Sequence, residues 1–167
     1  YISKKNVVEV IRAHSITPGI NDLKLKYGTM PKSSNECVAD SKMFSKSDIG
    51  QTITLSSDNT KSTLKMFKYT KYTIVGIVDS PYYLNFERGS TTLGNGTVTS
   101  FLYMSKNAFA CDYYTEIYIK LNTTADIYTN QYNNAVTNMK TPITNICNTR
   151  ANIRYAKIVD KATDELN

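Results

Sequence analysis

One segment limits the possible folds of this chain more than any other. It reads Tyr-Thr-Ile-Val-Gly-Ile-Val over Tyr72–Val78 and directly follows an alternating segment, Leu64–Tyr69. A short, continuous apolar run rich in β-branched residues is typical of a strand buried on both faces. We therefore expect an edge strand over 64–69 that leads into a central strand over 72–78. Gly76 inside that strand indicates a bulge or a close approach of another backbone.

Further strands are predicted on both sides of this central one. The segment 4–14 is compatible with either a short helix or a strand, because its Val and Ile residues fit both periodicities. The segment Tyr113–Leu121 places tyrosines and charges on one face and Thr115, Ile117, Ile119 and Leu121 on the other. The remaining predicted strands are Leu23–Tyr27, Glu36–Val38, Thr52–Leu55 and Val98–Met104.

Helices are predicted mainly near the C-terminus. Asp126 is available to cap a helix that contains Ile127, and Thr141-Pro142 has the pattern of the start of a second helix. The apolar stripe of this second helix is Ile143, Ile146, Cys147, Ile153, Ile158 and Val159. Short helices are expected over 41–47, capped by Asp40, and over 105–109, capped by Ser105. The expected fold class is α+β, with a mixed, largely antiparallel sheet over Leu23–Leu121, short helices and two C-terminal helices.

Length and charge limit the class of protein. A chain of 167 residues fits one domain, or one domain with a lobe, and is long enough to bury a core. Its formal net charge is +6, and residues 1–79 hold 12 basic and 7 acidic residues, a net of +5. This favours an anionic partner, or a solvated lysine-rich surface. No basic run or ribonucleoprotein-type motif is present, so we expect no nucleic-acid partner.

The residues needed for metal binding and catalysis are sparse. Cys37, Cys111 and Cys147 are widely spaced and His14 is the only histidine, so we expect no metal site, no cofactor and reduced thiols. No Gly-x-Ser-x-Gly or phosphate-binding loop occurs. A pair of carboxylates drawn from Asp79, Glu87 and Glu116 is the remaining catalytic possibility. We therefore predict no catalytic residues and no enzyme.

The irregular segment 81–96 holds the candidate ligand- or partner-binding residues. They are three aromatic residues and a cation: Tyr82, Tyr83, Phe86 and Arg88. Exposed aromatics beside an arginine are typical of a contact surface. The alternative is that these rings cover an open edge of the chain's own sheet. If the family resemblance given below holds, replacing Tyr82, Tyr83 and Arg88 by alanine should leave the fold intact, and loss of folding would show that the segment is structural.

Several short motifs occur in a particular order. They are Gly28-x-x-Pro31 with Asn35-Glu36, then Ile49-Gly50-x-Thr-Ile, then the Tyr72–Val78 strand, and last the predicted Tyr114–Leu121 strand with the helix after it. In this order and spacing they resemble the extracytoplasmic domain of FtsX-like or MacB-like ABC-transporter permeases. The resemblance runs from about residue 28 to the C-terminus, whereas residues 1–27 have no clear counterpart and 81–96 is longer than a minimal turn.

The resemblance implies a non-catalytic domain of two lobes, one porter-like and one strand-rich, on the extracellular side of the cell membrane. Its partners would be the transmembrane helices of the parent permease and a separate cytoplasmic ATP-binding subunit. Peptide, lipid or protein ligands and a dimer of the full transporter are further expectations. The chain would be a single domain fragment, with 142–167 as the start of a stalk. The Lys-, Asn- and Tyr-rich composition favours a Gram-positive source.

Two other functional classes stay open at this point. A free-standing secreted or surface-anchored binding module would share the strand pattern but would have a secretion signal and an anchor. A hydrolase would place Glu87 or Asp79 in a pocket with a strongly shifted pKa. The chain contains no 18-residue apolar run, so no membrane-spanning segment is predicted within it. The sequence does not identify a substrate or an oligomeric state.

Overall fold

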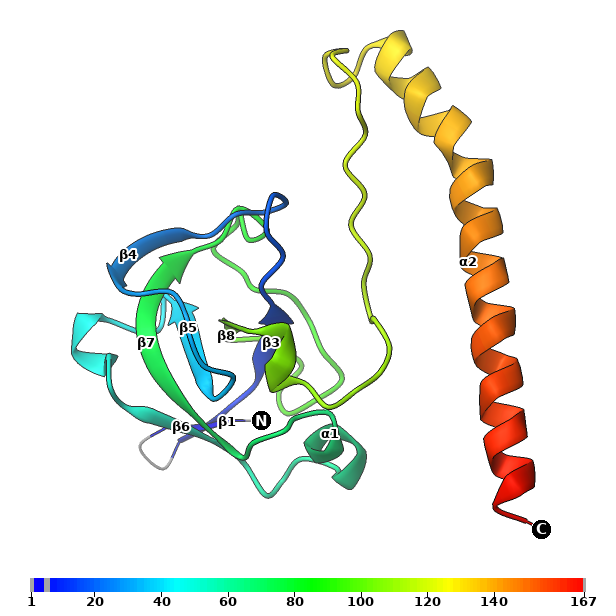
Figure 1. The fold of residues 1–167 in the computed structure, drawn as a ribbon. Helices are drawn as coiled ribbons and strands as arrows, with labels where there is room; N and C mark the ends of the chain where they lie inside the picture. The colour runs from blue at the N-terminus through cyan, green and yellow to red at the C-terminus, as the bar shows by residue number, and fades with distance from the viewer. Residues whose placement is uncertain (1, 5–6, 167) are drawn as a thin grey trace. The chain divides into compact units, whose positions relative to one another are not determined.

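The computed structural model of the chain describes residues 2–4 and 7–166, and Figure 1 shows its course. The chain divides into two units, one ending at Ile117 and the other beginning at Tyr118. The first unit contains a mixed sheet with short helices and the second contains a long helix. The predicted α+β class with a mixed sheet is confirmed.

The sheet of the first unit contains eight strands among the described residues, ordered β2-β1-β6-β7-β5-β8-β3, with β4 also paired to β7. Five of the strand pairings are antiparallel, and β3–β8 and β5–β7 are parallel. The strands are β1 (Ile2–Lys4), β2 (Val7–Glu9), β3 (Ile11–Ser15), β4 (Lys24–Gly28), β5 (Glu36–Asp40), β6 (Thr52–Leu55), β7 (Lys71–Asp79) and β8 (Ser100–Met104).

The sheet therefore begins before its predicted start at Leu23. The segment 4–14 contributes strands rather than a helix, although residues 5 and 6 lie outside the described residues. The sheet ends at Met104 rather than at Leu121.

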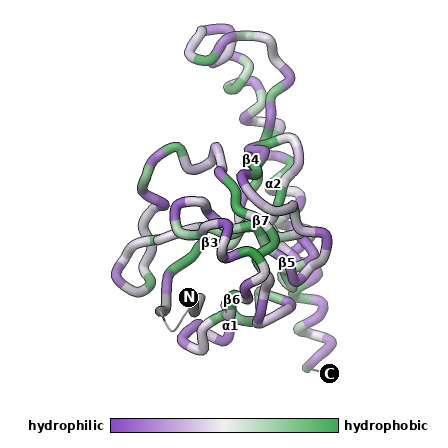
Figure 2. The backbone as a smooth tube through the Cα atoms, turned by 90° about the vertical axis from the view of Figure 1, so that its left-hand side faces the viewer, coloured by the Kyte–Doolittle hydropathy of each residue, from purple (hydrophilic) through white to green (hydrophobic). Residues whose placement is uncertain are grey.

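Strand β7 is the centre of the sheet, as its apolar run predicted. One of its edges pairs in parallel with β5, and the other edge is shared by β6 along the first half and β4 along the second. Figure 2 shows that hydrophobic residues gather along this strand. The core residues fall into two groups that alternate along β5 and β8: Cys37, Ala39, Leu102 and Met104 in one, Val38, Phe101 and Tyr103 in the other. Both faces of these strands are therefore covered.

Gly76 makes the close backbone approach that the sequence predicted. It lies opposite Gly28 of β4, and a Cβ on Gly76 would lie 2.5 Å from the carbonyl oxygen of Thr29. A Cβ on Gly28 would lie 2.2 Å from the Val75 carbonyl oxygen, and Gly28 also has a φ of +78°. The pairing of β5 with β7 shifts register between Cys37 and Val38, which produces the expected bulge. Only glycines allow the two backbones to lie this close.

Two local predictions in this unit are wrong. The segment 64–69 is not an edge strand, because α1 (Lys61–Lys65), capped by Thr60, occupies its start and Phe67 forms only an isolated bridge with Phe109. No helix covers 41–47: Asp40 Oδ1 accepts the Lys42 N–H at 3.0 Å in a turn, and the 3₁₀ helix η1 (Lys46–Asp48) begins after Ser45. The helix predicted after Ser105 is confirmed as η2 (Lys106–Ala108).

The predicted strand Tyr113–Leu121 is also wrong. The described backbone forms no ladder there, despite the clean alternation of its side chains. Ile117 and Ile119 have relative exposures of 68% and 50%. Alternation produces a strand only where the segment pairs with a neighbouring strand, and none of the pairings among the described residues includes 113–121.

The second unit contains one helix where two were predicted. Helix α2 (Asn130–Asp164) is capped by Thr129 rather than Asp126, and Pro142 lies inside it. Since proline lacks an N–H, the helix continues past it without one intrahelical hydrogen bond. At 100° per residue Ile143, Ile146, Cys147, Ile153 and Ile158 of the predicted stripe lie on one face of the helix, with Ile158 about 20° from Cys147. Val159 lies about 100° beyond Ile158, off this face.

No helix among the described residues is both long and apolar enough to span a bilayer.

Candidate functional site

The candidate site is the loop that follows β7. It begins at Pro81 and leads, through a tight turn closed by the Thr91 N–H bond to the Gly96 carbonyl, toward β8. Gly94 and Gly96 both have positive φ, as the predicted turn requires. The part from Tyr82 to Arg88 carries all four residues that the sequence nominated as binding residues.

Arg88 forms a buried, two-pronged ion pair with Asp40 at the end of β5. Its Nε lies 2.7 Å from Asp40 Oδ2 and its Nη2 lies 2.9 Å from Oδ1. The side chains of Arg88 and Asp40 have relative exposures of 11% and 1%. The third guanidinium nitrogen donates to the Asn85 carbonyl at 2.7 Å, so one arginine binds the sheet and the loop together.

Tyr83 holds the other side of the loop through an aromatic cluster, which we define as His14, Tyr82, Tyr83, Phe101 and Tyr103. Tyr83 stacks on Phe101, with ring centroids 4.6 Å apart and planes 6° apart. Its hydroxyl lies 2.6 Å from His14 Nε2. His14 itself stacks on Tyr103 at 4.8 Å, and Tyr82 meets both His14 and Tyr83 edge-on. The loop is therefore packed against β3 and β8.

The buried position of this cluster shifts the pKa values of its members. Burial lowers the pKa of His14 from its ordinary value of 6.5 to about 4, a shift that Glu116 opposes and Arg12 assists. Burial also raises the pKa values of the Tyr83 and Tyr103 hydroxyls above their ordinary range. The histidine is thus neutral near pH 7 and both tyrosines are protonated.

Phe86 and Leu84 face outward from the same loop. Leu84 has a relative exposure of 88% and Phe86 of 78%. Lys42 Nζ donates to the Phe86 carbonyl at 2.8 Å and lies 3.9 Å from the centre of its ring. Of the four nominated residues, Phe86 alone is exposed, whereas Tyr82, Tyr83 and Arg88 are partly buried.

Two residues of this site were missed by sequence reasoning. Asp40 ends a buried apolar strand, and a carboxylate in that position needs a cationic partner, which is a signal that could have been used. His14 lies 69 residues from Tyr83 along the chain, and nothing in the sequence pairs the two.

Of the carboxylates considered for catalysis, Asp79 is held by two neighbouring side chains. Asp79 accepts a hydrogen bond from the Ser41 hydroxyl and forms an ion pair with Lys26, whose Nζ lies 3.1 Å from Asp79 Oδ1. These contacts, the Ser41 bond foremost, lower the pKa of Asp79. Neither Asp79 nor Glu87 lines the pocket described next. Within the described ranges, no group of three or more His, Cys, Asp or Glu side chains could hold a metal ion.

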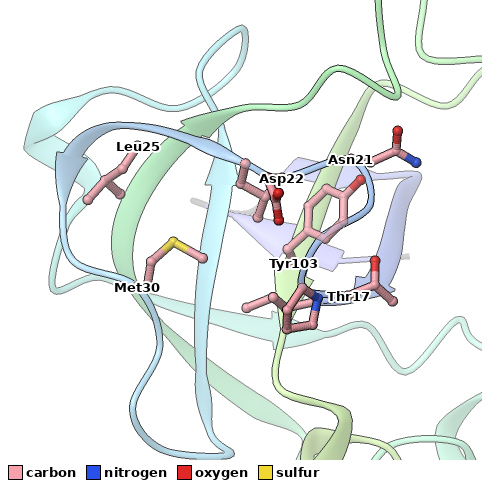
Figure 3. Close-up of a pocket in the computed structure, with 9 residues that line it drawn as sticks. Thr17, Asn21, Asp22, Leu25, Met30 and Tyr103 are labelled. Carbon is pink, nitrogen blue, oxygen red and sulfur yellow. The ribbon is translucent and has the colours of Figure 1, made fainter. Parts of the chain in front are cut away.

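A pocket of about 220 Å³ lies beside Tyr103, between the loop after β3 and the segment around β4. Figure 3 shows Asp22 and Tyr103 on one side of it and Leu25 and Met30 on the other. Its polar groups already have partners: Asp22 Oδ1 accepts from the Gly19 N–H, and the Tyr103 hydroxyl bonds to Ser80. The pocket therefore offers mainly apolar contact. Its lining residues are Ile16, Thr17, Pro18, Asn21, Asp22, Leu23, Leu25, Met30 and Tyr103.

Comparison of the chain with protein-family models, with curated proteins and with solved structures gives no match.

Proposed function

We propose that this chain is the extracytoplasmic domain of an FtsX/MacB-type ABC-transporter permease. In this role it has no catalytic chemistry and couples the ATP cycle of a cytoplasmic subunit to a substrate or partner outside the membrane. The proposal rests on the motif resemblance, and one structural observation supports it: the motif segments before residue 72 contact one another around β7.

The three motif segments before residue 72 bond directly to this strand, whereas Tyr114–Leu121, the last segment of the resemblance, forms no strand. The N–H of Gly50 donates to the Ile74 carbonyl at 2.8 Å, and the N–H of Thr73 donates to the Asn35 carbonyl at 2.9 Å. Gly28 pairs with Gly76, and the position of a Cβ on Gly28 would lie 3.0 Å from Ile49 Cδ1. These contacts are backbone hydrogen bonds and close packing, which position the strands of the fold. This is the pattern expected when a motif identifies a domain family without an active site.

Helix α2 supports a mechanical role. Its 35 residues correspond to a rod of about 50 Å at 1.5 Å per residue. A continuous helix transmits displacement along its axis better than two helices joined by a loop. The proposal assigns it to the stalk that links the sheet unit to the membrane.

The natural cysteines provide a test of location. Cys147 is exposed, whereas Cys37 is buried and burial raises the pKa of its thiol to about 12. The experiment expresses the full-length protein, treats intact cells with a membrane-impermeant maleimide, and compares the wild type with Cys147→Ser. We expect labelling of intact cells that falls in the variant, because the reaction requires a thiol that the reagent can reach and that can lose its proton.

Alkaline extraction of the same membranes separates a permease from a secreted module without an anchor. A permease domain stays in the pellet with its transmembrane helices, whereas a secreted module that is held only by surface contacts is released. Labelling that requires cell lysis, or release into the alkaline supernatant, would contradict the proposal.

A further inference from the structure

The loop between Tyr83 and Arg88 presents two large apolar side chains to solvent. Leu84 and Phe86, which we call the apolar tip, have relative exposures of 88% and 78%. Isolated apolar residues on a surface need no explanation, but these two lie two positions apart on one loop. The contacts around these two side chains indicate a role in binding.

The apolar tip is held by contacts on both sides. Tyr83 precedes it and packs into the aromatic cluster, while Arg88 follows it and binds the buried Asp40. Arg88 also binds the carbonyl of Asn85, the residue between the two apolar side chains. A loop held in this way loses little conformational entropy when its exposed side chains become buried, which favours binding.

A lysine contacts the apolar tip. Lys42 Nζ donates to the Phe86 carbonyl and lies over the Phe86 ring. The residue before Lys42, Ser41, accepts a hydrogen bond from Lys26 at 3.2 Å, and Lys26 pairs with Asp79 at 3.1 Å.

We propose that the apolar tip inserts into the interface of an anionic lipid bilayer, with Lys42 at the level of the headgroups. Apolar and aromatic side chains beside lysines are the combination that lipid interfaces favour. Two side chains are too few for a stable protein interface, which buries at least about 1,000 Å². The chain's net charge of +6 adds a long-range attraction to anionic headgroups. This inference does not depend on the proposed permease function.

The chain contains no tryptophan, so a single substitution creates a specific reporter of insertion. The test compares Leu84→Trp with Leu166→Trp, because both leucines have a relative exposure of 88%. Each variant of the 167-residue chain is mixed with vesicles of phosphatidylcholine and phosphatidylglycerol that carry brominated acyl chains. We expect a blue shift and bromine quenching for Leu84→Trp and neither for Leu166→Trp.

A second measurement tests the binding itself by vesicle sedimentation. The double variant Leu84→Ser/Phe86→Ser should lose at least about tenfold in vesicle affinity, since it removes the apolar area that becomes buried. Its thermal unfolding should match the wild type, because both side chains are exposed. Lys42→Glu should weaken binding to the anionic vesicles only.

Three outcomes would overturn the proposal. They are equal quenching of the two tryptophan reporters, unchanged affinity of the double-serine variant, and absence of wild-type binding to anionic vesicles. The last would favour a protein partner for the apolar tip.

Discussion

Replacing Arg88 by alanine removes the contact that joins the loop to the centre of the sheet. Asp40 would stay buried, at 0% exposure, without its cation. Its remaining bonds are the Lys42 N–H at 3.0 Å and a long contact with the Ser100 hydroxyl at 3.4 Å. These do not neutralise the carboxylate. The alanine variant therefore tests whether the loop is part of the folded core.

The expected loss of stability in Arg88→Ala follows from the burial of the Arg88–Asp40 ion pair. Breaking a buried ion pair by removing one partner costs about 3–5 kcal/mol, because the other charge stays desolvated. Both side chains are almost fully buried, so solvent screening does not reduce this figure much. We expect Arg88→Ala to lower the free energy of unfolding by about 3 kcal/mol. For a unit of this size that corresponds to a fall in Tm of roughly 10 °C or more.

Urea unfolding followed by circular dichroism provides the measurement. The matched control is Lys26→Ala, because the Lys26–Asp79 pair is 43% and 44% exposed and should contribute less than about 1 kcal/mol. Adding Asp40→Asn to Arg88→Ala should recover part of the stability, since the unpaired charge is gone. Equal effects of the two alanine substitutions, or no recovery in the double variant, would refute the reasoning.

Two further predictions concern the same unit. Because the pKa of His14 is lowered from 6.5 to about 4, the unfolded chain binds more protons between these values. The free energy of unfolding should be highest above about pH 6.5 and fall by up to about 3 kcal/mol toward pH 4. Urea unfolding at several pH values should show a smaller decline for His14→Phe. The same pH profile in the variant and the wild type would contradict this prediction. Gly76→Ala should lower the free energy of urea unfolding by about 1–3 kcal/mol, because the new Cβ would lie 2.5 Å from the Thr29 carbonyl oxygen. An unchanged free energy of unfolding would show that the two backbones can separate.

The local patterns that predicted the fold correctly are those fixed by short-range physics. The apolar run of Tyr72–Val78 predicted a strand with both faces buried, and Gly76 within it predicted a close backbone approach. Ser105 correctly predicted the start of a short helix through its side-chain cap. Each of these signals lies in neighbouring residues, although the backbone that approaches Gly76 belongs to the distant Gly28 and Thr29.

The predictions that failed depend on distant neighbours. Tyr113–Leu121 alternates as a strand should, but a strand requires a partner edge that the alternation does not reveal. Pro142 was expected to start a helix, yet helical residues on both sides carry α2 through it. A proline disfavours a helix locally and does not determine where a long helix ends.

The candidate site shows the same limit. The aromatic and arginine content of the loop was visible in the sequence, but the direction of each side chain was not. Arg88 and Tyr83 turn inward because their partners lie on other strands. Arg88 binds Asp40 of β5, and the Tyr83 hydroxyl contacts His14 of β3. Their removal is now expected to cost stability, in contrast to the intact fold expected from the sequence for the variant with Tyr82, Tyr83 and Arg88 replaced by alanine.

The measurement that tests the permease proposal most directly is purification of the full-length protein from detergent-solubilised membranes. The account predicts that a separate ATP-binding subunit co-purifies with it, and that the complex hydrolyses ATP. A full-length protein that is recovered without any ATP-binding subunit or ATPase activity, and that leaves the membrane on alkaline washing, would contradict it.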